Sequence, residues 1–126
     1  PNTLKYLTKL TGLQSLRMSG LIPPGFFTNL FQTLTQLEAL HVSTWKDINV
    51  YDEDLLYLSN LGCLRSLTLY SLDQATSGGM RRALSRLTNL KYLNVAGKRL
   101  VPSEMDFIIE MPLRVVKING AIAKNA

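Results

Sequence analysis

The chain has 126 residues, of which 46% are hydrophobic and 18% are charged, so it can form one domain with a core and is too weakly charged for a disordered tail. Fourteen lysines and arginines against nine acidic residues give a net charge of +5, which would attract a phosphate-rich partner. A single cysteine excludes an internal disulfide and, with no Asn-x-Ser/Thr site, favours a reducing, cytoplasmic setting, and no apolar run is long enough for a membrane span.

One phrase of leucines recurs along the chain. When its copies are aligned on Leu16, Leu40, Leu67, Leu93 and Val116, they lie 24, 27, 26 and 23 residues apart. The copies read LTGLQSLRMSG at 10–20, LTQLEALHVST at 34–44, LGCLRSLTLYS at 61–71, LTNLKYLNVAG at 87–97 and, in degenerate form, MPLRVVKINGA at 111–121. Within each copy the apolar residues are spaced three apart and then two apart. This spacing fits neither a helix nor a simple strand, but it fits a chain that turns as it enters a short strand. We predict one domain over residues 1–126 with about five repeats and strands near 14–18, 38–42, 65–69, 91–95 and 115–118.

The segments between these strands have helical spacing. Phe27, Leu30, Phe31 and Leu34 would share one helical face. Three later segments repeat the theme with Leu55, Leu58 and Leu61, with Met80, Leu84 and Leu87, and with Met105, Ile108 and Ile109.

Each of these segments begins with a recognisable start signal. Pro23-Pro24-Gly25 opens the first, the carboxylates of Asp52-Glu53-Asp54 suit the start of the second, and Thr76 to Gly79 open the third. We read the acidic trio as a helix start because a calcium loop spreads its ligands over about a dozen residues. Ser103, followed by Glu104 and Asp106, resembles a capping box for the fourth.

The first residues lead directly into the first strand. Residues 2–10 read as the end of a return helix, and no polar cap precedes Leu10. A stacked array needs polar caps at its ends, so we expect the chain to be a fragment of a longer protein.

These repeats resemble the leucine-rich-repeat family, whose strand phrase is L-x-x-L-x-L and whose period is 20 to 29 residues. The resemblance implies an α/β solenoid, with a curved parallel sheet on the concave side and helices on the convex side. The family often carries Asn or Cys three residues after the last strand leucine. Here those positions hold Leu21, Trp45, Leu72 and Lys98, which points to an irregular variant such as those of intracellular NOD-like receptors, plant resistance proteins and F-box adaptors.

Strand alternation predicts which side chains face outward from the concave sheet. The outward positions are mostly small or uncharged, with tyrosines and a basic residue near each end. Solenoids often bind partners on this face, although such residues can also simply solvate a sheet. The candidate partner-binding residues are Arg17, His41, Thr68, Tyr70, Tyr92, Asn94 and Lys117.

Little in the sequence suggests catalysis. His41 is the only histidine, so no histidine metal cluster can form, and no carboxylate on a neighbouring strand position would orient it against a serine. Cys63 lacks a clear activator, and Gly78-Gly79 is not followed by the Lys-Ser/Thr of a phosphate loop. We therefore expect no enzyme activity and no cofactor.

Three binding functions remain open. We expect recognition of another protein, or of a different domain of the parent chain, in an innate-immune receptor of the NOD-like class. The first alternative is substrate recognition in an F-box ubiquitin-ligase adaptor. The second is nucleic-acid binding through a basic patch of Arg81, Arg82 and Arg86, which we disfavour because no nucleic-acid motif accompanies it.

Overall fold

The computed structural model describes all residues except 1–5, 8, 21, 24, 45 and 126, and it leaves the side chains of 123–125 undescribed. It is an α/β fold with one six-stranded sheet whose strands lie in chain order. The first five strands are parallel, and the sixth runs antiparallel to the fifth. The strands are β1 Ser15–Ser19, β2 Ala39–Ser43, β3 Ser66–Leu69, β4 Tyr92–Val95, β5 Val115–Ile118 and β6 Ala121–Asn125.

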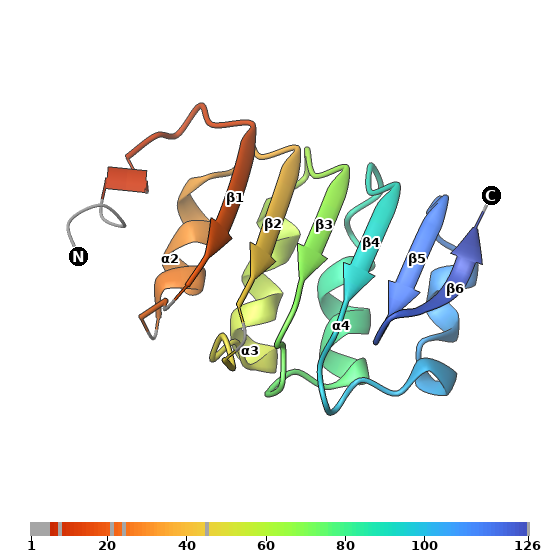
Figure 1. Ribbon diagram of the computed structural model, residues 1–126. Coiled ribbons are helices and arrows are strands. Elements are labelled where there is room, and N and C mark those ends of the chain that lie inside the picture. The colour runs from red at the N-terminus through yellow and green to blue at the C-terminus, as the bar shows by residue number, and fades with distance from the viewer. Residues whose placement is uncertain (1–5, 8, 21, 24, 45, 126) are drawn as a thin grey trace.

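The return segments form a second layer that covers one face of the sheet (Figure 1). This layer contains α-helices and short 3-10 helices (η). They are α2 Phe26–Thr33, α3 Asp52–Leu55, η1 Leu56–Asn60, α4 Ser77–Leu84, η2 Pro102–Glu104 and η3 Asp106–Ile109. In the described part of the chain, no helix is both long and apolar enough to cross a lipid bilayer.

The repeated leucines set the register of the sheet. Leu16, Leu40, Leu67, Leu93 and Val116 pair side by side across the five parallel strands. Each of the first four strands begins one residue later than predicted, because the chain is still turning at the residue after the second leucine of the phrase. The leucine column faces the helices, where it joins one contiguous core that extends from Leu16 to Ile118.

The first three return segments bury the residues that their spacing predicts. Phe27, Leu30, Phe31 and Leu34 are all buried, and α3 starts at the acidic trio as expected. Thr76 is the N-cap of α4, because its hydroxyl accepts a hydrogen bond from the Gly79 amide at 3.1 Å. Part of the first start signal, Pro24, and most of the predicted N-terminal helix end lie outside the described residues.

The fourth return segment differs from the prediction. It forms two 3-10 helices, Ser103 is exposed and makes no cap, and Ile109 is 70% exposed. A 3-10 helix has three residues per turn, so Met105 and Ile108 share a buried face while Ile109 turns away from it. The predicted capping box and the burial of Ile109 are therefore wrong.

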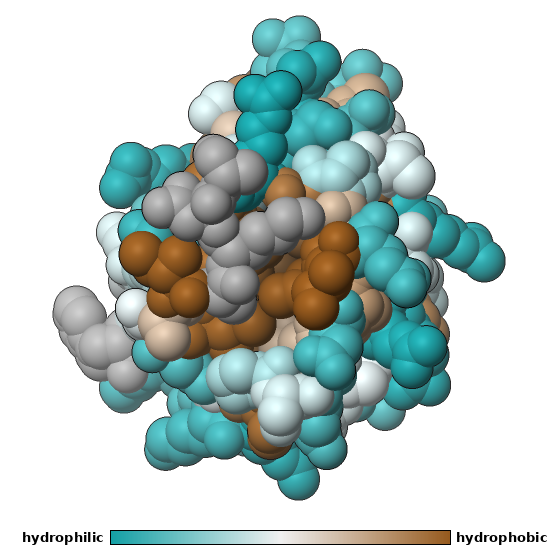
Figure 2. Space-filling model, turned by 90° about the vertical axis from the view of Figure 1, so that its right-hand side faces the viewer, coloured by the Kyte–Doolittle hydropathy of each residue, from teal (hydrophilic) through white to brown (hydrophobic). Residues whose placement is uncertain are grey.

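The sixth strand was not predicted from the repeats. β5 and β6 are joined by Asn119 and Gly120, both with positive φ (52° and 83°), and Asn-Gly is the preferred dipeptide of a two-residue hairpin. Figure 2 looks at this end of the sheet, where apolar surface lies beside the residues drawn in grey. Ile122 on β6 is 61% exposed there.

Candidate functional site

The face of the sheet away from the helices carries the predicted binding residues, and we call it the sheet face. Its middle column follows the register of the strands, with Arg17 beside His41, and then Thr68, Asn94 and Lys117 on β3, β4 and β5. No carboxylate occupies an outward position of β1 to β5 in the described residues. The sheet face is therefore neutral to basic.

A hydrogen-bonded aromatic cluster forms the centre of the sheet face. The side-chain amide of Asn94 donates to the Tyr70 hydroxyl at 2.7 Å and to the Tyr92 hydroxyl at 3.4 Å. The His41 ring meets the Tyr70 ring edge to face, with centroids 6.0 Å apart. Tyrosines from two neighbouring repeats are thus held by one amide.

Two members of the middle column are not available to solvent. Thr68 is 4% exposed and Asn94 is 8% exposed, although both were expected to face outward. They do lie on the sheet face, but Asn94 lies under the two tyrosine hydroxyls, and Thr68 lies between His41 and Asn94. Asn94 therefore holds the two tyrosine hydroxyls, and Tyr70, Tyr92 and Arg17 remain partly or fully accessible on the sheet face.

His41 has a lowered pKa. Desolvation by burial is the main cause that lowers its pKa below the ordinary value of 6.5, and the positive charge of Arg17 on the adjacent strand lowers it further. The imidazole is therefore neutral at pH 7 and packs as an uncharged ring against Tyr70.

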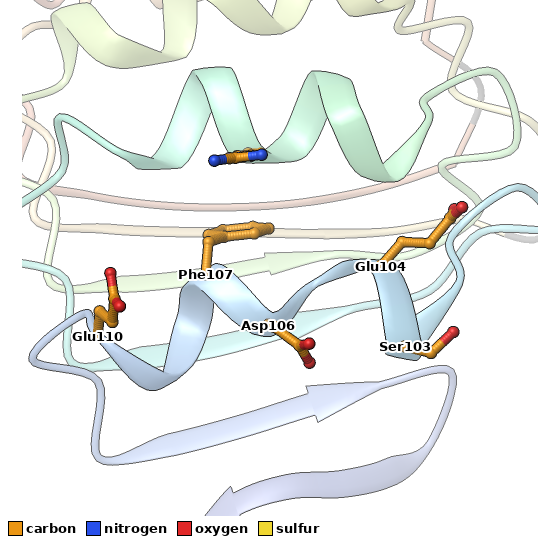
Figure 3. A pocket seen from close by; sticks show the side chains of 6 residues that line it. Ser103, Glu104, Asp106, Phe107 and Glu110 are labelled. Carbon is orange, nitrogen blue, oxygen red and sulfur yellow. The ribbon is translucent and has the colours of Figure 1, made fainter.

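The three arginines of the alternative basic patch do not share one surface. Arg82 and Arg86 are four residues apart and line a hollow with Leu56, Ser59 and Ser85. Arg81 points about 100° away around the helix and lines a different hollow with Ser103, Glu104, Asp106, Phe107 and Glu110. In Figure 3 the carboxylates of Glu104 and Glu110 lie on either side of the Phe107 ring, and Asp106 points away from it. Carboxylates beside Arg81 make that hollow unfavourable for a phosphate.

Cys63 is exposed in the turn before β3. No group of three or more His, Cys, Asp or Glu side chains among the described residues could hold a metal ion.

A second set of basic side chains was not predicted from the sequence as a group. Arg65, Lys91 and Arg114 come immediately before β3, β4 and β5, and we call them the basic edge row. They follow the same leucine of the repeated phrase in three successive copies, so the aligned copies contained the signal. The corresponding positions of the first two copies hold Gln14 and Glu38.

Comparison of the chain with family models, with curated proteins and with solved structures gave no match.

Proposed function

We propose that this chain is a leucine-rich-repeat solenoid that recognises another protein through its sheet face. The repeating unit is supported by side-chain hydrogen bonds between residues one repeat apart. Thr76 bonds Asp52, 24 residues away, at 2.6 Å, and Gln74 bonds Asp47, 27 residues away, at 2.7 Å. Asn89 bonds the Gly62 carbonyl, also 27 residues away, at 3.0 Å. These separations match the sequence period, as expected when each repeat packs only on its neighbours.

The aromatic cluster is the observation that supports recognition of a protein. Tyrosine and arginine supply much of the binding energy in protein interfaces. Asn94 holds the two hydroxyls, so Tyr70 and Tyr92 would lose little side-chain freedom when a partner binds, and less affinity would be lost to ordering. Arg17 lies at the edge of this cluster, exposed to solvent.

The cellular role rests on the resemblance of the repeats. An irregular leucine-rich repeat without the asparagine column fits a ligand-sensing or autoregulatory region of a cytoplasmic NOD-like receptor, whose partner is another protein or another domain of the same chain. Substrate choice in an F-box adaptor fits the same surface. Nucleic-acid binding is disfavoured because Arg81 lies apart from Arg82 and Arg86, among carboxylates.

Binding to a purified partner tests this proposal. Proteins that bind the immobilised chain are purified from extracts of the cells that produce it. They are then titrated against the unsubstituted chain, a Tyr70→Ala/Tyr92→Ala variant and a Tyr51→Ala/Tyr57→Ala control. Tyr51 and Tyr57 are 46% and 39% exposed and belong to the helical layer. We expect the sheet-face variant to lose about tenfold or more in affinity and the control to keep it.

Folding and the rival surface need their own controls. Thermal melts check that each variant is folded, and Tyr70→Phe/Tyr92→Phe separates the rings from the hydroxyls. Unchanged affinity in the Tyr70/Tyr92 variant, together with a loss in an Arg81→Ala/Arg82→Ala/Arg86→Ala variant, would refute the proposal.

A further inference from the structure

The basic edge row is a continuous line of positive charge. Ser66 pairs with Tyr92, and Tyr92 pairs with Val115, so the residues just before them also lie side by side. The Lys91 amide donates to the Arg65 carbonyl at 2.8 Å, and the Arg114 amide donates to the Lys91 carbonyl at 2.8 Å. Neighbouring strands are about 4.8 Å apart, so the row extends over about 10 Å across β3, β4 and β5.

The side chains of this row have no partner within the described fold. Arg65 and Arg114 are exposed and Lys91 is half-buried, and among the described residues none of the three side chains makes a hydrogen bond or an ion pair. The acidic side chains differ from them. The carboxylates of Asp47, Asp52, Asp54 and Asp73 each accept hydrogen bonds from neighbouring repeats. These four carboxylates are held by hydrogen bonds within the fold, whereas the three cations of the row are not.

The charges are also separated in space. Seven of the nine acidic residues, Asp47, Asp52, Glu53, Asp54, Asp73, Glu104 and Asp106, follow the ends of the strands and lie in or before the return helices. Of the other two, Glu110 lines the hollow beside Phe107, and Glu38 occupies the place in line with the row at the start of β2. The positions directly before the strands are therefore basic at β3, β4 and β5 and acidic at β2, and Glu110 lies in the connection between η3 and β5.

We propose that the basic edge row binds an extended acidic segment of a protein partner, laid across the beginnings of β3, β4 and β5. Arginine guanidinium groups form paired hydrogen bonds with carboxylates, and two of the three cations are arginines. Three residues of an extended chain span about 10 Å, so a short acidic stretch matches the length of the row. Glu38 would repel the same segment at β2, which fixes where the acidic stretch must end.

A nucleic acid fits this row less well. Three cations supply fewer contacts than a protein that makes about 6–10 phosphate contacts.

The row adjoins the sheet face, because Tyr92 follows Lys91 directly. Binding of an acidic segment there rests on the proposed function and names the chemistry of the partner.

Binding of a fluorescent oligo-glutamate peptide tests the inference, with oligo-lysine and a single-stranded oligonucleotide as comparison probes. The test variant is Arg65→Gln/Lys91→Gln/Arg114→Gln. The matched control is Arg81→Gln/Arg82→Gln/Arg86→Gln, which lowers the net charge from +5 by the same three charges. We expect the edge-row variant to lose about tenfold or more in affinity for oligo-glutamate and the control to stay within about twofold. Glu38→Gln should tighten binding.

Three results would overturn the inference. They are no binding of oligo-glutamate at physiological salt, equal losses in the two triple variants, or tighter binding of the oligonucleotide that depends on the same three residues. This titration does not involve the sheet-face tyrosines. A Tyr70→Ala/Tyr92→Ala variant that loses its protein partner but keeps oligo-glutamate affinity would separate the two proposals.

Discussion

His41 shows how a neighbouring repeat changes the chemistry of a single residue. Its pKa is lowered by desolvation and by Arg17, so the unfolded chain, with a pKa near 6.5, binds the proton more readily than the folded chain. The stability that depends on neutral His41 is fully present above about pH 6.5 and is lost as the pH falls towards the folded pKa. We predict that the melting temperature of the parent chain falls between about pH 7 and pH 5.5, and that it falls less in His41→Gln.

The change in stability over this pH range can be assigned to His41 because the chain has one histidine. Arg17→Gln, which removes the second cause of the shift, should give an intermediate pH dependence. Identical melting curves against pH for the parent chain and His41→Gln would contradict this account.

Gly97 is needed for its lack of a side chain. A Cβ atom there would lie 2.2 Å from the Leu72 carbonyl oxygen, which belongs to the backbone of the preceding repeat and cannot move aside easily. We expect Gly97→Ala to lower the free energy of unfolding by about 1–3 kcal/mol or more, the usual range for overpacking. Denaturant unfolding measures the loss.

Gly62 provides the matched control. A Cβ atom at Gly62 would meet nothing within 4 Å, so Gly62→Ala should be neutral or slightly stabilising. A Gly97→Ala variant as stable as Gly62→Ala would show that the two repeats can move apart at no cost.

Residue positions were predictable where one repeat determines them. The leucine column followed from the phrase itself, and the structure buries it. Thr68 and Asn94 lie in the predicted outward column, but their burial was not predicted. For Asn94 the burial goes with bonds to the Tyr70 and Tyr92 hydroxyls, and strand alternation does not predict the rotamers of those side chains. The contact of Gly97 with Leu72 likewise depends on how closely two repeats approach, which no single copy of the phrase encodes.

Helices were also predictable where a single repeat determines them. The helices α2 and α4 have strong apolar spacing and lie where the sequence predicted them. The fourth return segment carries Pro102 and forms 3-10 helices, and a capping-box pattern alone could not distinguish these from an α-helix. The start of each helix depends partly on the neighbouring repeat, and Asp52 is the clearest case.

Asp52 joins the starts of α3 and α4. Its carboxylate accepts from the Thr76 amide at 2.9 Å and from the Thr76 hydroxyl at 2.6 Å, and that hydroxyl in turn caps the Gly79 amide. We predict that Asp52→Ala lowers the free energy of unfolding by about 1–3 kcal/mol, because the part-buried amide and hydroxyl of Thr76 both lose their acceptor. Chemical denaturation measures the change.

Glu53 is the control for this element. It lies in the same first turn of α3 and is exposed, so Glu53→Ala should change stability by no more than about 0.5 kcal/mol. Equal effects of the two substitutions would mean that the carboxylates act only through the helix end and that the link to Thr76 contributes nothing.

At the scale of the whole molecule, the parallel order of β1 to β5 agreed with the repeat spacing, whereas β6 did not belong to the pattern. The Asn119-Gly120 hairpin signal lies inside the degenerate fifth copy of the phrase, and the leucine spacing alone does not predict a sixth strand. The distribution of charge was also not predicted. The net charge and the arginines Arg81, Arg82 and Arg86 suggested a basic patch on the helical side. Alignment of the repeat copies instead places Arg65, Lys91 and Arg114 in the basic edge row.

The basic edge row should destabilise the fold. Arg65, Lys91 and Arg114 lie on adjacent strands, and like charges side by side are destabilising by about 0.2–1 kcal/mol per pair. Lys91 is in the middle, so Lys91→Glu replaces two repulsive pairs with two attractive ones. We predict that this variant melts at a higher temperature than the parent chain at low salt, that the gain shrinks at high salt, and that oligo-glutamate binding is lost. Arg82→Glu, with the same change in net charge on α4, should show neither the gain nor the loss. If Lys91→Glu bound oligo-glutamate as well as the unsubstituted chain does, the row would not be the site of the acidic segment. If Lys91→Glu melted no higher than Arg82→Glu, the row would not be destabilised by its own charge.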